Sequence, residues 1–387
     1  MPHWKSIHIE NFRRLENLRL DDLGTVNLLV GKNNSGKTSV LEALAIASNP
    51  TSATQWIDVG RERELKSART PLLEVLGWFF PHDHPRENGY DGTAAMKVTL
   101  TDGRAVDIRA EYREFRQVEM TPEPEDGSDF VDEEPSEYAA TLEIWLKNDP
   151  IGSLLEELPV IHEFSGRSFK DVGPGSRLVP CQLVTPVSHR TSRQLLAGID
   201  QILEDRMKPE VIRLLQLLAP DVEDIEIRSP QGRGAVIHLY HSKIGHVPLA
   251  VEGDGMRRAL GFASACVQAR GGMLLLDEVE TALHPEALSG VFRFLVEICR
   301  EQRVQLFVST HSLEAVDAML ASVGDDVSDL VAYHLPHRDS GQDVYRLGGE
   351  SIRSMRSEGG VVTDGRVKID NNWIENATRH LIGHRRS

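Results

Sequence analysis

The sequence is short of the features that mark secreted, membrane-spanning and disulfide-stabilised proteins. Its 387 residues include three cysteines, Cys181, Cys266 and Cys299, which are far apart and form no CxxC pair. This spacing fits neither a disulfide framework nor a zinc site. No uninterrupted apolar run reaches the roughly 18 residues that a membrane span needs, and the first residues lack the apolar stretch of a signal peptide. We therefore expect a soluble, cytoplasmic protein without membrane contact.

Positive charge is also scarce. Lys and Arg number 43 against 59 Asp and Glu, which gives a formal net charge of −16. Such a balance argues against a uniformly basic protein that coats nucleic acid. Half of the charge comes from eight acidic residues within residues 123–137, a run without Lys or Arg. We interpret this run as a solvated or disordered loop, and the alternative is a docking loop for a basic partner.

A glycine-rich loop between a predicted strand and a predicted helix carries the clearest chemical signal. The apolar run Val26–Val30 leads into Gly31–Thr38, which fits the pattern GxxxxGK[ST] in full, and helical spacing follows from Ser39. Main-chain N–H groups of such a loop surround phosphate oxygens, and the helix points its positive end at the same anion. We expect Lys37 to pair with the β- and γ-phosphates of ATP and the Thr38 hydroxyl to bind Mg²⁺. The predicted nucleotide-binding residues of this loop are Gly31, Lys32, Asn33, Asn34, Ser35, Gly36, Lys37, Thr38 and Ser39.

Two further predicted strands end in polar residues that suit ATP hydrolysis. The apolar run Met273–Leu276 is typical of a strand buried on both faces, and Asp277 and Glu278 follow it directly. We expect Asp277 to lie beside the Mg²⁺ and Glu278 to polarise the attacking water. A second buried strand, Val304–Val308, precedes His311, the candidate sensor of the γ-phosphate. The predicted catalytic residues are thus Glu278 and His311, and the predicted metal ligands are Thr38 and Asp277.

The segments between these motifs predict an α/β protein with a β-rich middle region. Alternation in Ser6–Glu10 and in Met96–Phe115, around a Thr-Asp-Gly turn, indicates strands, and Tyr138–Leu146 indicates another. We expect residues 60–90 to be irregular because prolines interrupt them. Helical spacing runs through residues 191–219, and Pro209 separates two helices. A strand near Ala235–Tyr240 and a helix of about 16 residues ending at Gly271 complete the pattern, with no long heptad array.

Three sets of residues resemble the RecF, SMC and OLD-type ATPases. They are Ile9–Leu15 followed by the P-loop, Asp277–Pro285, and Gly253–Arg258. The resemblance implies an ABC-type ATPase head, with a mixed or parallel sheet flanked by helices, an antiparallel β subdomain and a helical subdomain. In that family two heads enclose two ATP molecules. By this resemblance Gly253, Asp254 and Gly255 would cap the partner's ATP with main-chain N–H groups, and Arg257 would add charge. The LSGGQ signature of transporter ATPases is absent, which disfavours a transporter.

These motifs divide the chain into four predicted regions. They are the P-loop part of the head at 1–58, a β-rich insertion with the acidic loop at 59–190, a helical segment with the rest of the head at 191–363, and a tail at 364–387. Residues 364–376 resemble a segment of DDE insertion-sequence transposases, with Glu375 at that family's last catalytic acid. Because only this short segment matches, we expect the tail to be inert. We also expect no TOPRIM nuclease domain after His311.

The function that these features favour is an ATPase that dimerises on ATP and gates a separate effector. By family analogy the effector would be a nuclease in anti-phage defence. One alternative is a RecF-like DNA-repair ATPase that binds DNA in its ATP form, and the acidic balance counts against it. Another is a nucleotide-gated scaffold with little turnover. Glu278 and His311 argue against the scaffold, because a protein that only binds ATP needs neither.

Overall fold

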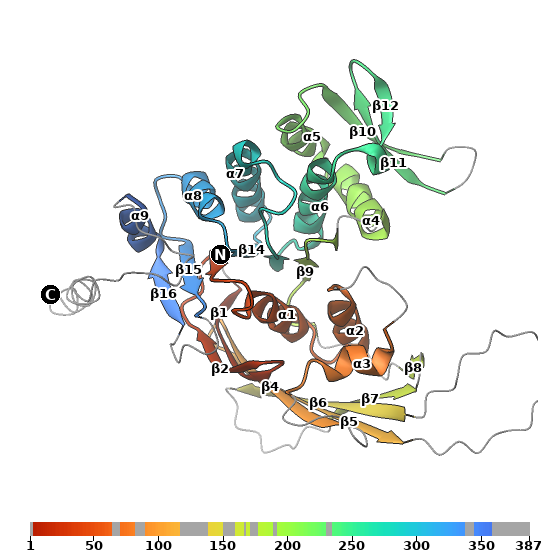
Figure 1. The fold of residues 1–387 in the computed structure, drawn as a ribbon, viewed down its shortest axis with the longest axis vertical. Helices are drawn as coiled ribbons and strands as arrows, with labels where there is room; N and C mark the ends of the chain where they lie inside the picture. Colours follow the sequence, from red (N-terminus) through yellow and green to blue (C-terminus); the bar gives the residue numbers. More distant parts are fainter. Residues whose placement is uncertain are drawn as a thin grey trace, which may run out of the picture.

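The computed structural model describes residues 3–63, 70–81, 90–116, 138–149, 159–165, 168–170, 177–188, 192–229, 234–336 and 344–357. These residues form stacked layers: helices, a mixed sheet, a second set of helices, and an antiparallel sheet (Figure 1). The acidic run at 123–137 and the transposase-like tail at 364–387 lie outside the described residues. The predicted α/β class, with a mixed sheet, an antiparallel sheet and flanking helices, is confirmed.

The six-stranded mixed sheet positions the P-loop and the strands that follow it in sequence. Its order is β16-β15-β3-β14-β13-β9, and all neighbours are parallel except β15 and β16. Parallel strands end at the same edge of a sheet, so the residues after β3, β13 and β14 share one edge. The strands are β3 (Val26–Val30), β9 (Cys181–Val184), β13 (Met273–Leu276), β14 (Gln305–Thr310), β15 (Leu330–His334) and β16 (Tyr345–Gly348).

Continuous apolar sequence explains why the central strands of this sheet are buried on both faces. Every residue of β13 is fully buried, and so is nearly every residue of β3. Helices cover both sides, α1 on one face and α6 to α8 on the other (Figure 1). The two predicted buried strands, Met273–Leu276 and Val304–Val308, are therefore confirmed, the second as β14.

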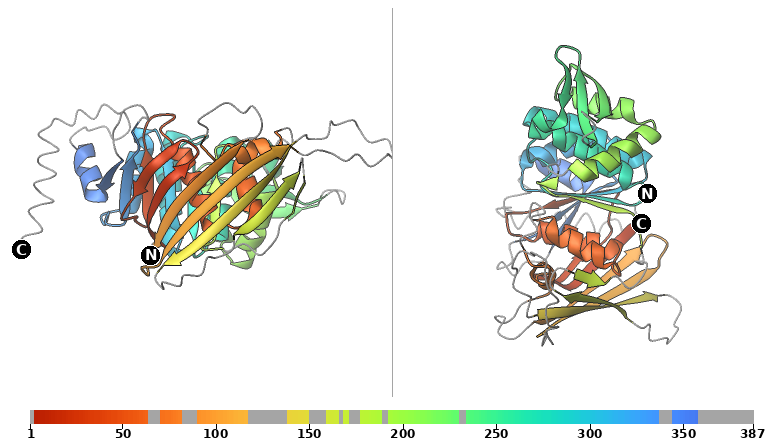
Figure 2. Two further views of the ribbon diagram at one scale, coloured as in Figure 1. Left: turned by 90° about the horizontal axis from the view of Figure 1, so that it is seen from below. Right: turned by 90° about the vertical axis from the view of Figure 1, so that its right-hand side faces the viewer.

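A seven-stranded antiparallel sheet forms the opposite side of the molecule (Figure 2). Its order is β2-β1-β4-β5-β6-β7-β8, so the N-terminal hairpin continues into the middle region of the chain through β1 and β4. The hairpin predicted around Thr101–Gly103 is confirmed as β4 and β5. The strands are β1 (Trp4–Phe12), β2 (Leu15–Leu20), β4 (Asp91–Leu100), β5 (Ala105–Arg116), β6 (Tyr138–Asp149), β7 (Val160–Ser165) and β8 (Ser168–Lys170).

Three helices lie between the two sheets: α1 (Lys37–Ser48), α2 (Ala53–Arg61) and α3 (Leu72–Gly77). The expectation that residues 60–90 are irregular is wrong for α3. Pro71 is the N-cap of this helix, where a proline is tolerated because the first helical N–H groups have no partner within the helix. Leu72 and Leu76 are buried, and this apolar packing outweighs the helix's short length.

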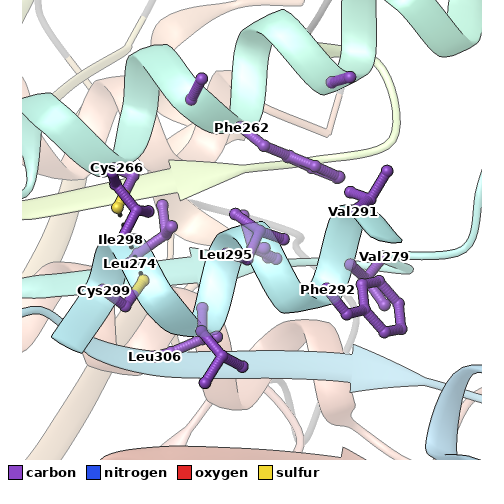
Figure 3. Packing of buried hydrophobic residues seen from close by; sticks show 14 of the residues in the cluster. Phe262, Cys266, Leu274, Val279, Val291, Phe292, Leu295, Ile298, Cys299 and Leu306 are labelled. Atoms are coloured by element: carbon purple, nitrogen blue, oxygen red, sulfur yellow. Dashed lines mark hydrogen bonds between the residues drawn. The ribbon is translucent and has the colours of Figure 1, made fainter. Parts of the chain in front are cut away.

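Six more helices belong to the other layer. Pro209 occupies the first turn of α5, so the predicted break between two helices falls just before it. The contact of α6 and α7 with the sheet is filled by Phe262, Leu295 and their neighbours (Figure 3). Full burial of one such side chain contributes about 1.5–3 kcal/mol. The helices are α4 (Ser192–Glu204), α5 (Lys208–Gln216), α6 (Asp254–Gln268), α7 (Pro285–Glu301), α8 (Leu313–Val323) and α9 (Gly349–Ser357).

A small antiparallel sheet projects beside α5 and leads directly into α6 (Figure 1). It consists of β10 (Val222–Arg228), β11 (Val236–His241) and β12 (Gly245–Pro248), and β11 confirms the strand predicted near Ala235–Tyr240. A short 3-10 helix, η3 (Leu249–Val251), connects β12 to the start of α6. Among the described residues, no helix combines the length and apolar character that crossing a membrane requires.

Candidate functional site at the edge of the mixed sheet

The P-loop runs from the end of β3 to the start of α1, as predicted. Gly36 is the N-cap of α1 and has a φ of 91°, a left-handed conformation that favours glycine. Asn34 also has a positive φ, 65°, which asparagine tolerates better than most residues. The loop therefore turns sharply, and its main chain passes over the N-terminus of α1.

The Lys37 amine lies inside this loop. Its Nζ donates hydrogen bonds to the carbonyl oxygens of Gly31 and Lys32, both at 2.8 Å. Burial lowers the pKa of Lys37 from its ordinary value, and the negative charges of Asp277, Glu278 and Glu280 act against that shift. The structure therefore places the amine next to the loop main chain and within electrostatic range of the acids that follow β13.

The Thr38 hydroxyl and the Asp277 carboxylate meet at this edge, although they are 239 positions apart. Thr38 Oγ1 donates a hydrogen bond to Asp277 Oδ2 at 2.9 Å. The other oxygen, Asp277 Oδ1, accepts from Ser309 Oγ at 2.5 Å. Hydroxyl and carboxylate oxygens are the hard donors that Mg²⁺ prefers. The donor set of Thr38 and Asp277 therefore fits a magnesium ion bound together with phosphates.

Glu278 leaves β13 in a strained backbone conformation. Its φ is 43°, and a non-glycine residue in the left-handed region costs roughly 1–2 kcal/mol. Two contacts hold it there: its N–H donates to Ser309 Oγ at 2.9 Å, and its carbonyl accepts from Arg258. The Thr281 hydroxyl lies 3.4 Å from Glu278 Oε2. Backbone strain that is held in place by several neighbouring contacts is typical of functional sites.

His311 follows β14 at the same edge. Its Nδ1 lies 3.3 Å from Glu280 Oε1, and its main-chain N–H donates to the same oxygen at 3.2 Å. The side chain is 46% exposed, so one side of the ring is open to solvent. The three predicted strand ends, after β3, β13 and β14, thus bring Lys37, Glu278 and His311 to one edge of the sheet.

Arg258 is a residue of this site that the sequence did not reveal. It is fully buried in α6, and its guanidinium donates to three main-chain carbonyls, those of Thr185 at 3.0 Å, Asp277 at 2.8 Å and Glu278 at 2.7 Å. Burial lowers its pKa to about 10, so it stays charged at neutral pH. Arg258 therefore connects α6 and the end of β9 to the acids after β13. No role was predicted for Arg258, which is the last residue of the segment Gly253–Arg258 that resembles the ATPase family.

The predicted signature segment lies at the start of α6. Gly253 is the N-cap of α6 and makes no side-chain cap hydrogen bond, and Asp254 is the first helical residue. A Cβ on Gly255 would lie 2.8 Å from the Ala282 carbonyl oxygen, so only glycine fits this close approach. Arg257 Nε donates to the Glu252 carbonyl at 3.2 Å, and the side chain is 26% exposed. Contact of this segment with a second chain stays a prediction.

A cavity of about 1080 Å³ opens beside the P-loop. It lies between the loop, the β1–β2 hairpin and the segment after β15, and its lining combines basic, acidic, polar and apolar side chains. Arg63 belongs to this lining. It pairs with the buried Glu42 at 2.6 Å and donates to Ser39 Oγ at 3.2 Å. Lining residues that the sequence analysis did not single out include Leu18, Arg19, Arg63, Phe80 and Val344.

Two family models match parts of the chain that include the P-loop and the strands after it. A model described as "AAA ATPase domain" matches residues 4–138, and one described as "AAA domain, putative AbiEii toxin, Type IV TA system" matches residues 178–317. The chain is 22% identical over 339 residues to an "ATP/GTP phosphatase" of Helicobacter pylori, covering 81% of this chain and 87% of that protein. It is 48% identical over 44 residues to the RecF replication and repair protein of Clostridioides difficile, covering 11% and 12% of the two chains.

Solved structures similar to this chain include two SMC heads. One is bound to the C-terminal winged-helix domain of ScpA, with 13% identity, a TM-score of 0.49, and 92% of this chain and 100% of that chain covered. The other, from Pyrococcus furiosus, has 12% identity, a TM-score of 0.47, and 92% and 99% coverage. These likenesses are too distant to carry the argument. The two family matches and the relative from Helicobacter pylori support an ATPase of the AAA type, and the similarity to RecF covers a short segment of the chain.

Proposed function

We propose that the protein binds Mg-ATP at the P-loop edge and hydrolyses it to ADP and phosphate. The observation that carries this proposal is the hydrogen bond between Thr38 and Asp277, because it unites the P-loop with the acids after β13. Glu278 is the next residue, and the Lys37 amine lies within electrostatic range of both acids. A phosphate clamp, a magnesium donor set and a carboxylate base are thus gathered in one place.

Each residue has a distinct role in this mechanism. The loop main chain and Lys37 bind the β- and γ-phosphates, since an ammonium is a strong donor to phosphate oxygens. Thr38 and Asp277 hold the magnesium ion, which supplies positive charge to the phosphate oxygens when it is bound. Glu278 accepts a proton from the attacking water, or orients it. His311 contacts the γ-phosphate from the neighbouring strand end. The other P-loop residues, Gly31 to Gly36 and Ser39, surround the nucleotide.

The cavity beside the P-loop is the place for the nucleoside. Its wall includes Asn34, Ser35 and Ser39 of the loop and first helix turn, so a nucleotide with phosphates on the loop extends naturally into it. Apolar side chains such as Leu18 and the half-exposed Trp78 suit a base, and nearby arginines suit polar ribose and phosphate atoms.

The start of α6 suits contact with ATP held by a second copy of the chain. Gly253 leaves the first N–H groups of α6 without a side-chain cap, and such a helix end attracts anions. Gly253, Asp254, Gly255 and Arg257 would then contact the partner's γ-phosphate. Dimerisation on ATP would gate a separate effector. We propose a nuclease in anti-phage defence as that effector, by analogy with the family resemblance.

Phosphate release from the purified protein tests the ATPase proposal. We expect ATP-dependent release that requires Mg²⁺ and stops with EDTA, and heat on adding Mg-ATP in a calorimeter. Size-exclusion chromatography with and without ATP tests dimerisation. Absence of both heat and phosphate release would overturn the proposal, whereas heat without release would favour a nucleotide-gated scaffold.

A second candidate is an ATPase that binds DNA in its ATP form. The similarity to RecF over 44 residues favours it, although the net charge of −16 opposes it. DNA binding that needs ATP and weakens steeply with salt would establish this function. Binding that is equal with and without ATP would exclude it.

A further inference from the structure

We propose that Glu280 is a positioning residue that fixes the ring of His311 for its contact with the γ-phosphate. Glu280 lies outside the predicted P-loop, metal-binding and catalytic sets. The inference rests on the proposed ATPase function, because it concerns a residue of the same site. It adds a carboxylate that acts through His311 rather than through the nucleotide.

One carboxylate oxygen gathers three groups from the end of β14. Glu280 Oε1 accepts from Thr310 Oγ1 at 2.8 Å and from the His311 main-chain N–H at 3.2 Å. The same oxygen lies 3.3 Å from His311 Nδ1. Glu280 therefore holds both the main chain and the ring of His311. Within the described residues, no other carboxylate forms an ion pair with His311.

The contact between Glu280 and His311 determines which ring nitrogen is directed away from Glu280. A carboxylate next to Nδ1 favours a proton on Nδ1, because the Nδ1–H then donates to Oε1. Nε2 lies on the opposite side of the ring, and the side chain is 46% exposed. The ring is thus held in one orientation with Nε2 directed away from Glu280. A histidine without this carboxylate would rotate about its side-chain bonds and sample both tautomers.

The backbone around Glu280 is itself constrained. The Val279 N–H donates to the Ser309 carbonyl at 3.2 Å, and the Leu283 N–H donates to the Glu280 carbonyl at 3.1 Å. Ala282 has a φ of 64°, which tightens this turn. These bonds join the turn after β13 to the end of β14. The Glu280 carboxylate is consequently fixed relative to His311 rather than carried on a free loop.

A purely structural role does not explain why a carboxylate stands here. Glu280 is only 14% exposed, and within the described residues its Oε2 is buried without a hydrogen-bond partner. Burying an unpaired charged oxygen is costly. A neutral side chain would bond Thr310 and the His311 main chain at lower cost. The Glu280 charge lies within electrostatic range of Lys37 and Arg258, and the carboxylate orients the imidazole through its contact with Nδ1.

A double-mutant cycle on phosphate release tests this inference. The variants are Glu280→Gln, His311→Ala and the two combined, and Glu286→Gln, with a 91% exposed carboxylate in α7, is the matched control. We expect Glu280→Gln to lower kcat about 10-fold, about 1.4 kcal/mol, with KM unchanged. In the His311→Ala background the same change should alter kcat less than about two-fold. Equal effects in both backgrounds would mean that Glu280 does not act through His311, and the inference would fail.

Two further measurements separate the possible outcomes. Glu280→Asp keeps the charge on a shorter side chain and should restore part of the lost kcat. If the unmodified protein releases no phosphate, the ATPase proposal fails, and the ring of His311 is then observed directly by ¹⁵N NMR of histidine-labelled protein, assigned with His311→Ala. Protonated Nδ1 in the unmodified protein that becomes unprotonated in Glu280→Gln supports the inference. Identical ¹⁵N signals in both would overturn it.

Discussion

The P-loop edge and the start of α6 hold their functional residues in different ways. At the P-loop edge, Thr38 and Asp277 meet across 239 positions through a hydrogen bond of 2.9 Å. At the start of α6, the hydrogen bond and ion pair of Arg257 go to Glu252 and Asp254, its near neighbours in sequence. The first site is assembled within one chain. The second presents an uncapped helix end that another molecule is able to approach.

Removing the carboxylate of Glu278 should have the largest effect on turnover. Glu278→Gln keeps the size and most contacts of the side chain but cannot accept a proton from water. Loss of a general base reduces rates by about 10²–10⁴-fold, so we expect kcat in phosphate release to fall by this range. ATP affinity measured by calorimetry should remain, and an ATP-bound dimer should accumulate on size-exclusion chromatography. Turnover at the unmodified rate would exclude Glu278 as the base.

Removing the Lys37 amine should weaken ATP binding about 100-fold. Hydrogen bonds to charged groups contribute about 1.5–3 kcal/mol each, and Lys37 would form more than one with the phosphates. Calorimetry with Mg-ATP on Lys37→Ala measures this loss. Lys97→Ala serves as the control, because Lys97 lies on β4 of the antiparallel sheet, outside the P-loop, and its side chain is 40% exposed. Unchanged affinity in Lys37→Ala would contradict the assembly of the site in one chain.

Arg258 joins the two regions, so its replacement tests whether they are coupled. Arg258→Lys retains the charge but loses the fork that reaches three carbonyls. We expect kcat to fall about 10-fold and the free energy of unfolding to fall by about 1–3 kcal/mol, because buried carbonyls lose their donors. Urea unfolding and phosphate release measure the two effects. Arg257→Lys, one position earlier and partly exposed, should change stability little.

Mixing two inactive variants tests whether the start of α6 acts on a partner. Lys37→Ala lacks the P-loop amine, and Gly253→Asp places an anion at the start of α6, where an added Cβ meets nothing within 4 Å. In an equal mixture about half of the dimers are mixed, and each mixed dimer has one intact composite site. We expect about a quarter of the unmodified activity to return. If the start of α6 acted within its own chain, the mixture would stay as inactive as its components.

The smallest expected effect concerns His334, at the end of β15 beside the P-loop. Burial, and then the charge of Lys37, lower its pKa from the ordinary 6.5. In acid the unfolded chain therefore binds a proton that the folded chain resists, so stability falls as pH drops below about 6.5 and is unaffected above it. In urea unfolding, the free energy of unfolding of His334→Gln should decrease less between about pH 6.5 and 5 than that of the unmodified protein. If the free energy of unfolding changed equally with pH in both proteins, His334 would not contribute to the pH dependence of stability.

Local sequence patterns were enough to predict the strands and motifs at the P-loop edge. The pattern from Val26 to Thr38 specifies a strand, a phosphate-binding turn and a helix by near-neighbour interactions alone, and the structure has all three. The apolar runs before Asp277 and His311 likewise predicted buried strands. The short helix α3 was not predicted. It depends on packing between two sheets, and the prolines around it suggested irregular structure.

The motifs predicted that Thr38 and Asp277 would meet, but no pattern in the sequence predicted the contacts of Arg258 and Glu280. Arg258 was only the last residue of the segment Gly253–Arg258, and the fold buries it against the carbonyls of Asp277 and Glu278. Glu280 lay within the segment Asp277–Pro285 without a predicted role, and the pairing of β13 with β14 brings it to His311.

The sequence by itself determined the chemistry of the P-loop, the acids after β13 and the buried character of the strands that carry them. Those properties depend on residue type and on spacing over a few positions. Only the tertiary structure decided which oxygen faces which donor, and which charged residue is buried. Strand order in the mixed sheet sets those distances, and strand order arises from packing across hundreds of residues rather than from any local pattern.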